Sequence, residues 1–173
     1  ALVCSILLYD ALHRLVTHSP VLLGLARFLL YLLGASVTQH GVTGWAVWCG
    51  LALAAYLAGM GYLAQWKNRP AEARYWPVIL MAVPLLLALL MNVGEYRQPA
   101  MLLSLILALW MLRCLRQAYW MPDPKVSRAL SGLTAGIVFV DWLAVADPPR
   151  LLSFCFIALF LAVLGLERLV AAR

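Results

Sequence analysis

Charged side chains are scarce in this sequence: they make up 12% of its 173 residues, against about 25% in a typical soluble domain. Hydrophobic residues make up 65%, and the mean hydropathy is +0.92. This composition excludes an ordinary soluble domain and predicts an all-α, multi-pass membrane protein with a single transmembrane domain over residues 1–173. The net charge of +6 does not indicate nucleic-acid binding, because the basic residues lie mostly in short connections between apolar runs.

Motifs for catalysis and metal binding are also missing. The four cysteines have no CxxC spacing and lie within apolar runs, so they predict buried side chains rather than a metal site or disulfide framework. No P-loop, GxSxG or HExxH sequence occurs. The first residues, "ALVCSILLYD", hold neither an initiator methionine nor the basic segment of a signal peptide, and are too few to cross a bilayer. We interpret them as the last turns of a helix whose beginning is missing.

Six apolar segments are long enough to cross a membrane. They cover residues 20–38, 42–64, 76–94, 99–118, 128–146 and 149–169, and each is bounded by proline, glycine or charge. The predicted fold is therefore a helical bundle of six full spans, preceded by the truncated first helix.

Basic residues alternate with these spans. Ten of the thirteen lie in segments 10–19, 65–75 and 113–128 or near the C-terminus, whereas only Arg97 and Arg150 lie in the alternate connections. The ten are Arg14, Lys67, Arg69, Arg74, Arg113, Arg116, Lys125, Arg128, Arg168 and Arg173. Because cytoplasmic connections carry the excess of lysine and arginine, these segments and the C-terminus are predicted to be cytoplasmic, and the spans are predicted to contact membrane lipids.

The remaining basic residue, Arg27, falls inside the apolar segment "VLLGLARFLLYLLGASV". An arginine at the centre of a membrane helix costs about 2.5–3.5 kcal/mol on insertion scales. Gly24, Arg27, Tyr31 and Gly34 recur at helical spacing, which places them on one face. We expect this face to line a polar cavity open to the cytoplasm. The alternative is that the guanidinium reaches the interface along its apolar stem.

Asp141 is the other charged residue within a span. Its depth differs from that of Arg27 by about 10 Å, so no direct ion pair between them is expected. A structural carboxylate is predicted, either hydrogen-bonded or ion-paired on the outer side. Gly132 and Gly136 form a GxxxG pattern. This pattern predicts close helix packing inside the bundle, with a dimer interface as the alternative.

The first cytoplasmic segment, "LLYDALHRLVTHSP", gathers Tyr9, Asp10, His13 and Arg14. Tyr9 and His13 are one helical turn apart and can share a face. His13 and His18 do not form a metal-ligand set by their spacing alone.

Several of these stretches resemble the second half of the UbiA prenyltransferase superfamily, most closely its EboC-like branch. "LLYDALHR" is similar to the family element in which a tyrosine and a basic residue end the fourth helix. Arg27, Gly34 and Ser36 match the pattern R-x-x-N-x-x-x-G-x-S, with Leu30 at the asparagine position. "AAYLAGMGYLAQ", which contains Tyr62, resembles the branch's sixth helix.

The resemblance implies a bundle around a cavity, in which aspartate motifs hold Mg²⁺ and the diphosphate of a prenyl donor. The residues that it places at the diphosphate or the cavity are Arg27, Tyr9, His13, Arg14, Tyr31, Tyr62 and Lys67. The chain departs from the family in its carboxylates: "QWKNRPAEARYW" has no DxxxD, and Asp10 is only a candidate metal ligand.

Prenyl transfer from an isoprenoid diphosphate to a lipophilic acceptor is therefore expected only if a missing N-terminal half supplies an aspartate motif. One alternative is a non-catalytic subunit of a larger membrane complex, which binds a quinone, a pigment or another isoprenoid lipid. A lipid or small-molecule transporter is the third interpretation, because intramembrane charges also line transport pathways.

Overall fold

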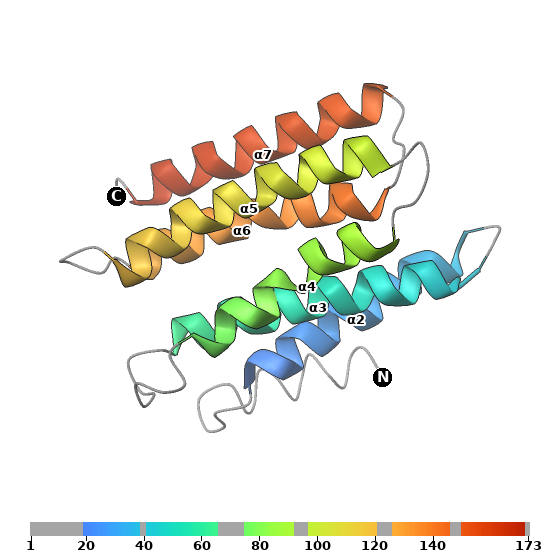
Figure 1. Cartoon of the computed structure of the whole chain (residues 1–173), viewed down its shortest axis with the longest axis horizontal. Helices are drawn as coiled ribbons and strands as arrows, with labels where there is room; N and C mark the ends of the chain where they lie inside the picture. Colours follow the sequence, from blue (N-terminus) through green and yellow to red (C-terminus); the bar gives the residue numbers. More distant parts are fainter. Residues whose placement is uncertain are drawn as a thin grey trace. The chain divides into compact units, whose positions relative to one another are not determined.

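The computed structural model describes residues 19–38, 41–65, 75–91, 97–120, 126–145 and 150–171. Within these ranges the chain forms six helices and no strand (Figure 1). They are α2 (Ser19–Ser36), α3 (Gly44–Ala64), α4 (Trp76–Met91), α5 (Arg97–Tyr119), α6 (Val126–Ala144) and α7 (Arg150–Ala171). The all-α prediction is confirmed for this part of the chain.

The helices coincide with the predicted spans, and each boundary lies within three residues of its predicted position. Three helices are long and apolar enough to cross a membrane: α3, α5 over Gln98–Tyr119, and α6. The apolar stretches of α2, α4 and α7 are shorter, at Pro20–Ser36, Trp76–Leu90 and Arg150–Leu166. The structure therefore supports a membrane protein with three candidate spans among the described residues.

Local sequence explains how the chain passes from α2 to α3. The hydroxyl of Thr38 donates to the carbonyl oxygen of Ala35 at 2.7 Å, just beyond the end of α2. Gly41 has a φ of 63°, a left-handed conformation that glycine adopts without steric cost. The hydroxyl of Thr43 accepts from the backbone N–H of Ala46 at 3.2 Å and caps the first turn of α3.

The chain divides into two compact units, Ala1–Leu87 and Ala88–Arg173, and each is described by itself. In the first, α3 is the central helix and is buried along most of its length. Gly50 faces Phe28 of α2, whereas Gly59 faces Met81 of α4. A Cβ on Gly59 would lie 2.6 Å from Met81 Cγ and 2.8 Å from the Pro77 carbonyl oxygen. The absence of a side chain at this position lets α4 approach α3 closely.

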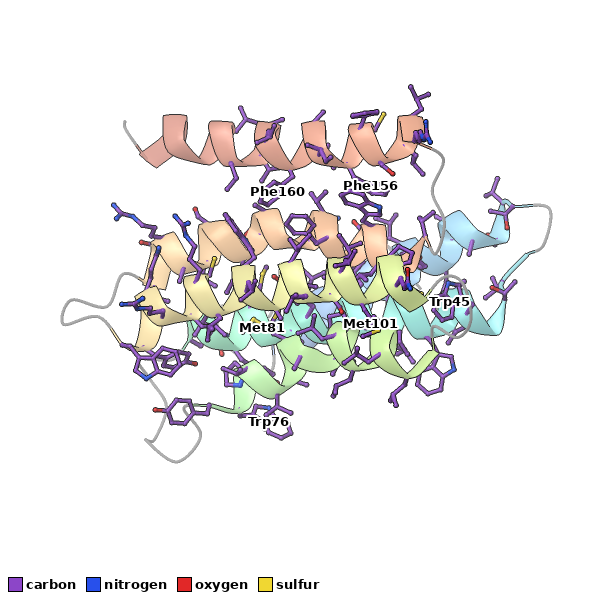
Figure 2. All side chains as sticks on the ribbon, turned by 45° about the horizontal axis from the view of Figure 1, so that its top comes forward. Trp45, Trp76, Met81, Met101, Phe156 and Phe160 are labelled. Carbon is purple, nitrogen blue, oxygen red and sulfur yellow. The ribbon has the colours of Figure 1, made fainter. Side chains whose placement is uncertain are left out.

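In the second unit, α6 packs against both α5 and α7. An aromatic cluster joins the three helices. Phe160 of α7 packs edge-on against Trp110 of α5, with ring centroids 5.1 Å apart, and lies 4.6 Å from Phe139 of α6. Trp142 of α6 stacks on Phe156 of α7 at 5.6 Å. Figure 2 shows Phe156 and Phe160 directed from α7 toward its neighbours.

Candidate functional site

The candidate site begins at α2, which packs one face tightly against α3. A Cβ on Gly24 would lie 2.6 Å from the carbonyl oxygen of Ala54. Farther along the same helix, the rings of Phe28 and Tyr31 lie against Gly50. Close packing of this kind between small residues and rings leaves little room between α2 and α3 at these levels.

Arg27 lies beside this contact face and is exposed. Leu30 and Leu33, on the following turns of α2, are 47% and 54% exposed, so the guanidinium is carried by an apolar, open surface. No hydrogen bond or ion pair joins the Arg27 side chain to another residue within the described part of the chain. The cation is therefore held on α2 without an anion from the described residues.

The four residues expected to share a face have different surroundings. Gly24 and Tyr31 point toward α3, Arg27 is exposed, and Gly34 has open space around its α-carbon. At about 100° per residue, Gly24 and Tyr31 differ by about 20° around the helix axis, whereas Arg27 is turned by about 60° from Gly24. The side of α2 that contacts α3 therefore includes Gly24 and Tyr31 but not Arg27.

Two candidate tyrosines occupy different levels of the first unit. Tyr31 is half-buried beside Gly50, near the start of α3, whereas Tyr62 is buried near its end. Twelve residues of helix separate Gly50 from Tyr62, which corresponds to about 18 Å along the axis. Arg27 lies between these levels, since the neighbouring Gly24 contacts Ala54. The structure thus spreads these candidates along α2 and α3 and does not gather them at one point.

The other residues expected at the diphosphate, together with the candidate metal ligand, lie outside the described residues. These are Tyr9, Asp10, His13, Arg14 and Lys67.

The predicted structural residues lie in the second unit. Gly132 of α6 faces α5, where a Cβ would lie 2.6 Å from Cys114 Sγ, and Gly136 is buried on the same helix. The GxxxG pair is therefore part of α6 where the helix packs within its own chain. Asp141 is half-buried on α6, directly before Trp142 of the aromatic cluster.

The described residues do not fit a magnesium–diphosphate centre. Among them, no three His, Cys, Asp or Glu side chains lie close enough to hold a metal ion together. Asp141 supplies the one carboxylate whose side chain is described. Mg²⁺ bound with diphosphate needs one or two carboxylates beside the phosphate oxygens, and the unit that holds Arg27 has no carboxylate among its described side chains.

Sequence reasoning missed Trp110, which anchors α5 to α6. Its indole Nε1–H donates to the carbonyl oxygen of Gly132 at 2.7 Å, and the guanidinium of Arg113 lies 5.9 Å from its ring centroid. The position of Trp110 in the sequence could have identified it, because Trp110 falls inside an apolar segment, whereas interfacial tryptophans fall at the ends of such segments. A buried indole usually requires an acceptor for its N–H.

Comparison with known proteins finds no matching family model, no matching curated protein and no matching solved structure.

Proposed function

We propose that the chain is a multi-pass membrane protein in which α2 to α7 each cross the bilayer. Segments 10–19, 65–75 and 113–128 and the C-terminus then lie in the cytoplasm. Two facts support this arrangement: ten of thirteen basic residues fall on one side of the alternation, and large apolar side chains are exposed on the described helices. A lipid environment removes the cost of exposing those side chains to water.

In this bundle the proposed function is to bind an isoprenoid lipid through its diphosphate, in the manner of the UbiA superfamily. The single observation that carries the proposal is Arg27, an exposed arginine on an apolar helix without an anionic partner among the described residues. An unpaired cation within a membrane is costly, and a bound anion offsets that cost. A planar guanidinium also matches two phosphate oxygens at once.

The proposal concerns binding. His13, Arg14 and Lys67 belong to the basic cytoplasmic segments, Tyr9 directly precedes the first of them, and all four are proposed to assist at the diphosphate. Prenyl transfer with Mg²⁺ would need carboxylates beyond Asp141, which belongs to the second unit. A binding role for the chain does not depend on transfer.

The test is the affinity of the detergent-purified chain for farnesyl diphosphate, measured by isothermal titration calorimetry. Arg27→Ala should weaken binding by at least about tenfold, since a hydrogen bond to a charged group contributes about 1.5–3 kcal/mol. Arg27→Lys should also weaken it, because lysine keeps the charge and the reach to the interface but lacks the bidentate fork.

Arg150→Ala is the matched control, since Arg150 is also exposed but lies in the other unit, at the start of α7. The affinity of this variant for farnesyl diphosphate should equal that of the unmodified chain. If the Arg27→Ala variant bound farnesyl diphosphate as tightly as the unmodified chain, Arg27 would not belong to the binding site. The arginine would then be one that only extends its side chain to the membrane interface.

A second candidate function is that of a non-catalytic subunit in a larger membrane complex, and α7 favours it. None of the described side chains of α7, residues 150–166, is buried. Phe154, Leu161 and Leu166 are 69%, 61% and 62% exposed. Native mass spectrometry of protein extracted from its own membranes would separate the candidates. A stoichiometric protein partner supports the subunit, whereas a chain that carries only lipid supports the lipid-binding protein.

A further inference from the structure

One face of α5 is exposed and apolar over most of its length. Leu102, Leu105, Leu109 and Leu112 lie on it and are 54% to 64% exposed. Their spacing of three or four residues places them on one side of the helix. The opposite side, which includes Leu107, Met111 and Cys114, is buried. The leucine face is therefore a surface that α5 does not use for packing within the second unit.

At its C-terminal end this face changes from apolar to cationic. Arg113 and Arg116 continue the same side of the helix, and both are exposed. Trp120 follows one turn later: its backbone N–H donates to the carbonyl oxygen of Arg116 at 3.0 Å, and its side chain is 63% exposed. Along one face the order is thus leucine, arginine and tryptophan.

A third arginine reaches the same level from α6. Gly132 contacts both Trp110, which donates to its carbonyl oxygen, and Cys114. Because the two helices run in opposite directions and keep this register, residue 128 lies opposite residue 116. Arg128 is exposed there, in the first turn of α6. Arg113, Arg116 and Arg128, here called the arginine triad, therefore lie within about one helical turn along the α5–α6 axis.

The triad has no anion of its own within the described part of the chain. Arg113 lies over the ring of Trp110, with its guanidinium carbon 5.9 Å from the centroid, which restricts where that side chain points. No hydrogen bond or ion pair joins the side chain of any of the three arginines to another described residue. Three cations at one level of the two helices, two of them on the leucine face itself, are complementary to a molecule with one anionic end and apolar chains.

We propose that the leucine face and the arginine triad bind an anionic glycerophospholipid. The phosphate is held by the triad, the acyl chains lie along the leucines, and Trp120 marks the interface. From Leu102 to Arg116 the helix rises about 21 Å, which is more than half of a hydrocarbon core of about 30 Å and accommodates one leaflet's chains. The site requires that α5 spans the membrane, and it does not depend on isoprenoid binding in the first unit.

The experiment is lipid retention. The chain is reconstituted into vesicles of phosphatidylglycerol and phosphatidylcholine in equal amounts, extracted into mild detergent and examined by native mass spectrometry. The unmodified chain should keep phosphatidylglycerol in preference. Each arginine near a membrane surface changes affinity for anionic lipid by about fivefold, so the triple variant Arg113→Gln, Arg116→Gln and Arg128→Gln should lose on the order of 100-fold.

Two further variants make the result interpretable. Arg150→Gln removes an exposed arginine from the opposite end of α6 and α7, and should retain the lipid as the unmodified chain does. The triple lysine variant keeps all three charges, and with them the membrane orientation, but lacks the bidentate fork. This variant should fold normally and retain a few-fold less phosphatidylglycerol than the unmodified chain. It therefore tests the proposal even if the glutamine variant fails to fold.

Three outcomes would overturn the proposal. The first is equal retention of the two phospholipids by the unmodified chain. The second is a loss in Arg150→Gln as large as in the triple glutamine variant. The third is displacement of phosphatidylglycerol by an equal concentration of inorganic phosphate or farnesyl diphosphate, which would identify a site for soluble phosphates. A chain that retains phosphatidylglycerol but fails to bind farnesyl diphosphate would contradict only the isoprenoid proposal.

Discussion

At the scale of single residues, the sharpest constraint is the contact between Gly24 and the backbone of Ala54. Because a Cβ at position 24 would lie 2.6 Å from that carbonyl oxygen, Gly24→Ala forces the backbones of α2 and α3 apart. Overpacking of this kind costs about 1–3 kcal/mol. The expected result is a lower free energy of unfolding, measured by titrating the detergent-solubilised protein with SDS and following tryptophan fluorescence.

Gly34→Ala is the control for this prediction, since it makes the same substitution on the same helix in open space. It should leave stability unchanged or raise it by up to about 1 kcal/mol, the difference in helix propensity between alanine and glycine. If Gly34→Ala destabilised the protein as much as Gly24→Ala, flexibility rather than close approach would explain the glycines of α2.

The same residues mark how far the sequence could predict the candidate site. Helical spacing predicted that Gly24, Arg27, Tyr31 and Gly34 share one side of a helix, and the structure shows that all four belong to α2. It could not tell which of them faces α3, because that depends on partners supplied by α3, namely Ala54 and Gly50. Arg27 was recognisable as an anomaly from sequence, but its exposure and its lack of a partner among the described residues were not.

At the scale of elements, the second unit depends on an indole that connects α5 to α6. Trp110→Phe keeps an aromatic ring beside Phe160 but removes the hydrogen bond to the carbonyl oxygen of Gly132. Hydrogen bonds between membrane helices contribute about 0.6 kcal/mol on average and up to about 1.7 kcal/mol. A loss of stability in this range is expected in the same SDS titration.

The matched control is Trp142→Phe in the same aromatic cluster. The Trp142 ring stacks on Phe156, and no side-chain hydrogen bond of Trp142 occurs among the described residues. Its replacement should therefore cost less than that of Trp110. Equal losses would mean that the size of the indole, and not its N–H, connects the helices.

Helix positions were predictable because apolar runs, prolines and charges mark them directly. The contacts between helices were not. Trp110 and Phe160 are fifty residues apart in sequence yet have ring centroids 5.1 Å apart, and nothing local to either residue specifies that pairing. Likewise, α3 is buried on faces toward both α2 and α4, which a uniformly apolar segment does not reveal.

At the scale of the whole molecule, the two units carry different chemical features. The first holds Arg27 on α2, beside helices packed through glycine, and the second holds the arginine triad and the leucine face. Both features are cations that lack an anionic partner among the described residues and lie next to exposed leucines. Such a protein is expected to obtain its counter-charges from lipids, which links its binding properties to its placement in the membrane.

That placement can be tested through the five connections between helices. In a chain whose native cysteines are replaced by alanine, single cysteines are introduced as Gln39→Cys, Asn68→Cys, Tyr96→Cys, Asp123→Cys and Asp147→Cys. A membrane-impermeant maleimide should modify positions 68 and 123 only from the cytoplasmic side, and positions 39, 96 and 147 only from the opposite side. Six crossings and the distribution of basic residues together require this alternation.

The decisive position is 96, because α4 has 16 residues and contains Pro84. Such a helix rises about 24 Å, less than a hydrocarbon core of about 30 Å, and crosses only if the bilayer thins locally or the helix extends. If position 96 were modified from the same side as position 68, α4 would not cross. The orientation of the whole second unit would then be reversed, and the arginine triad would face the outer leaflet.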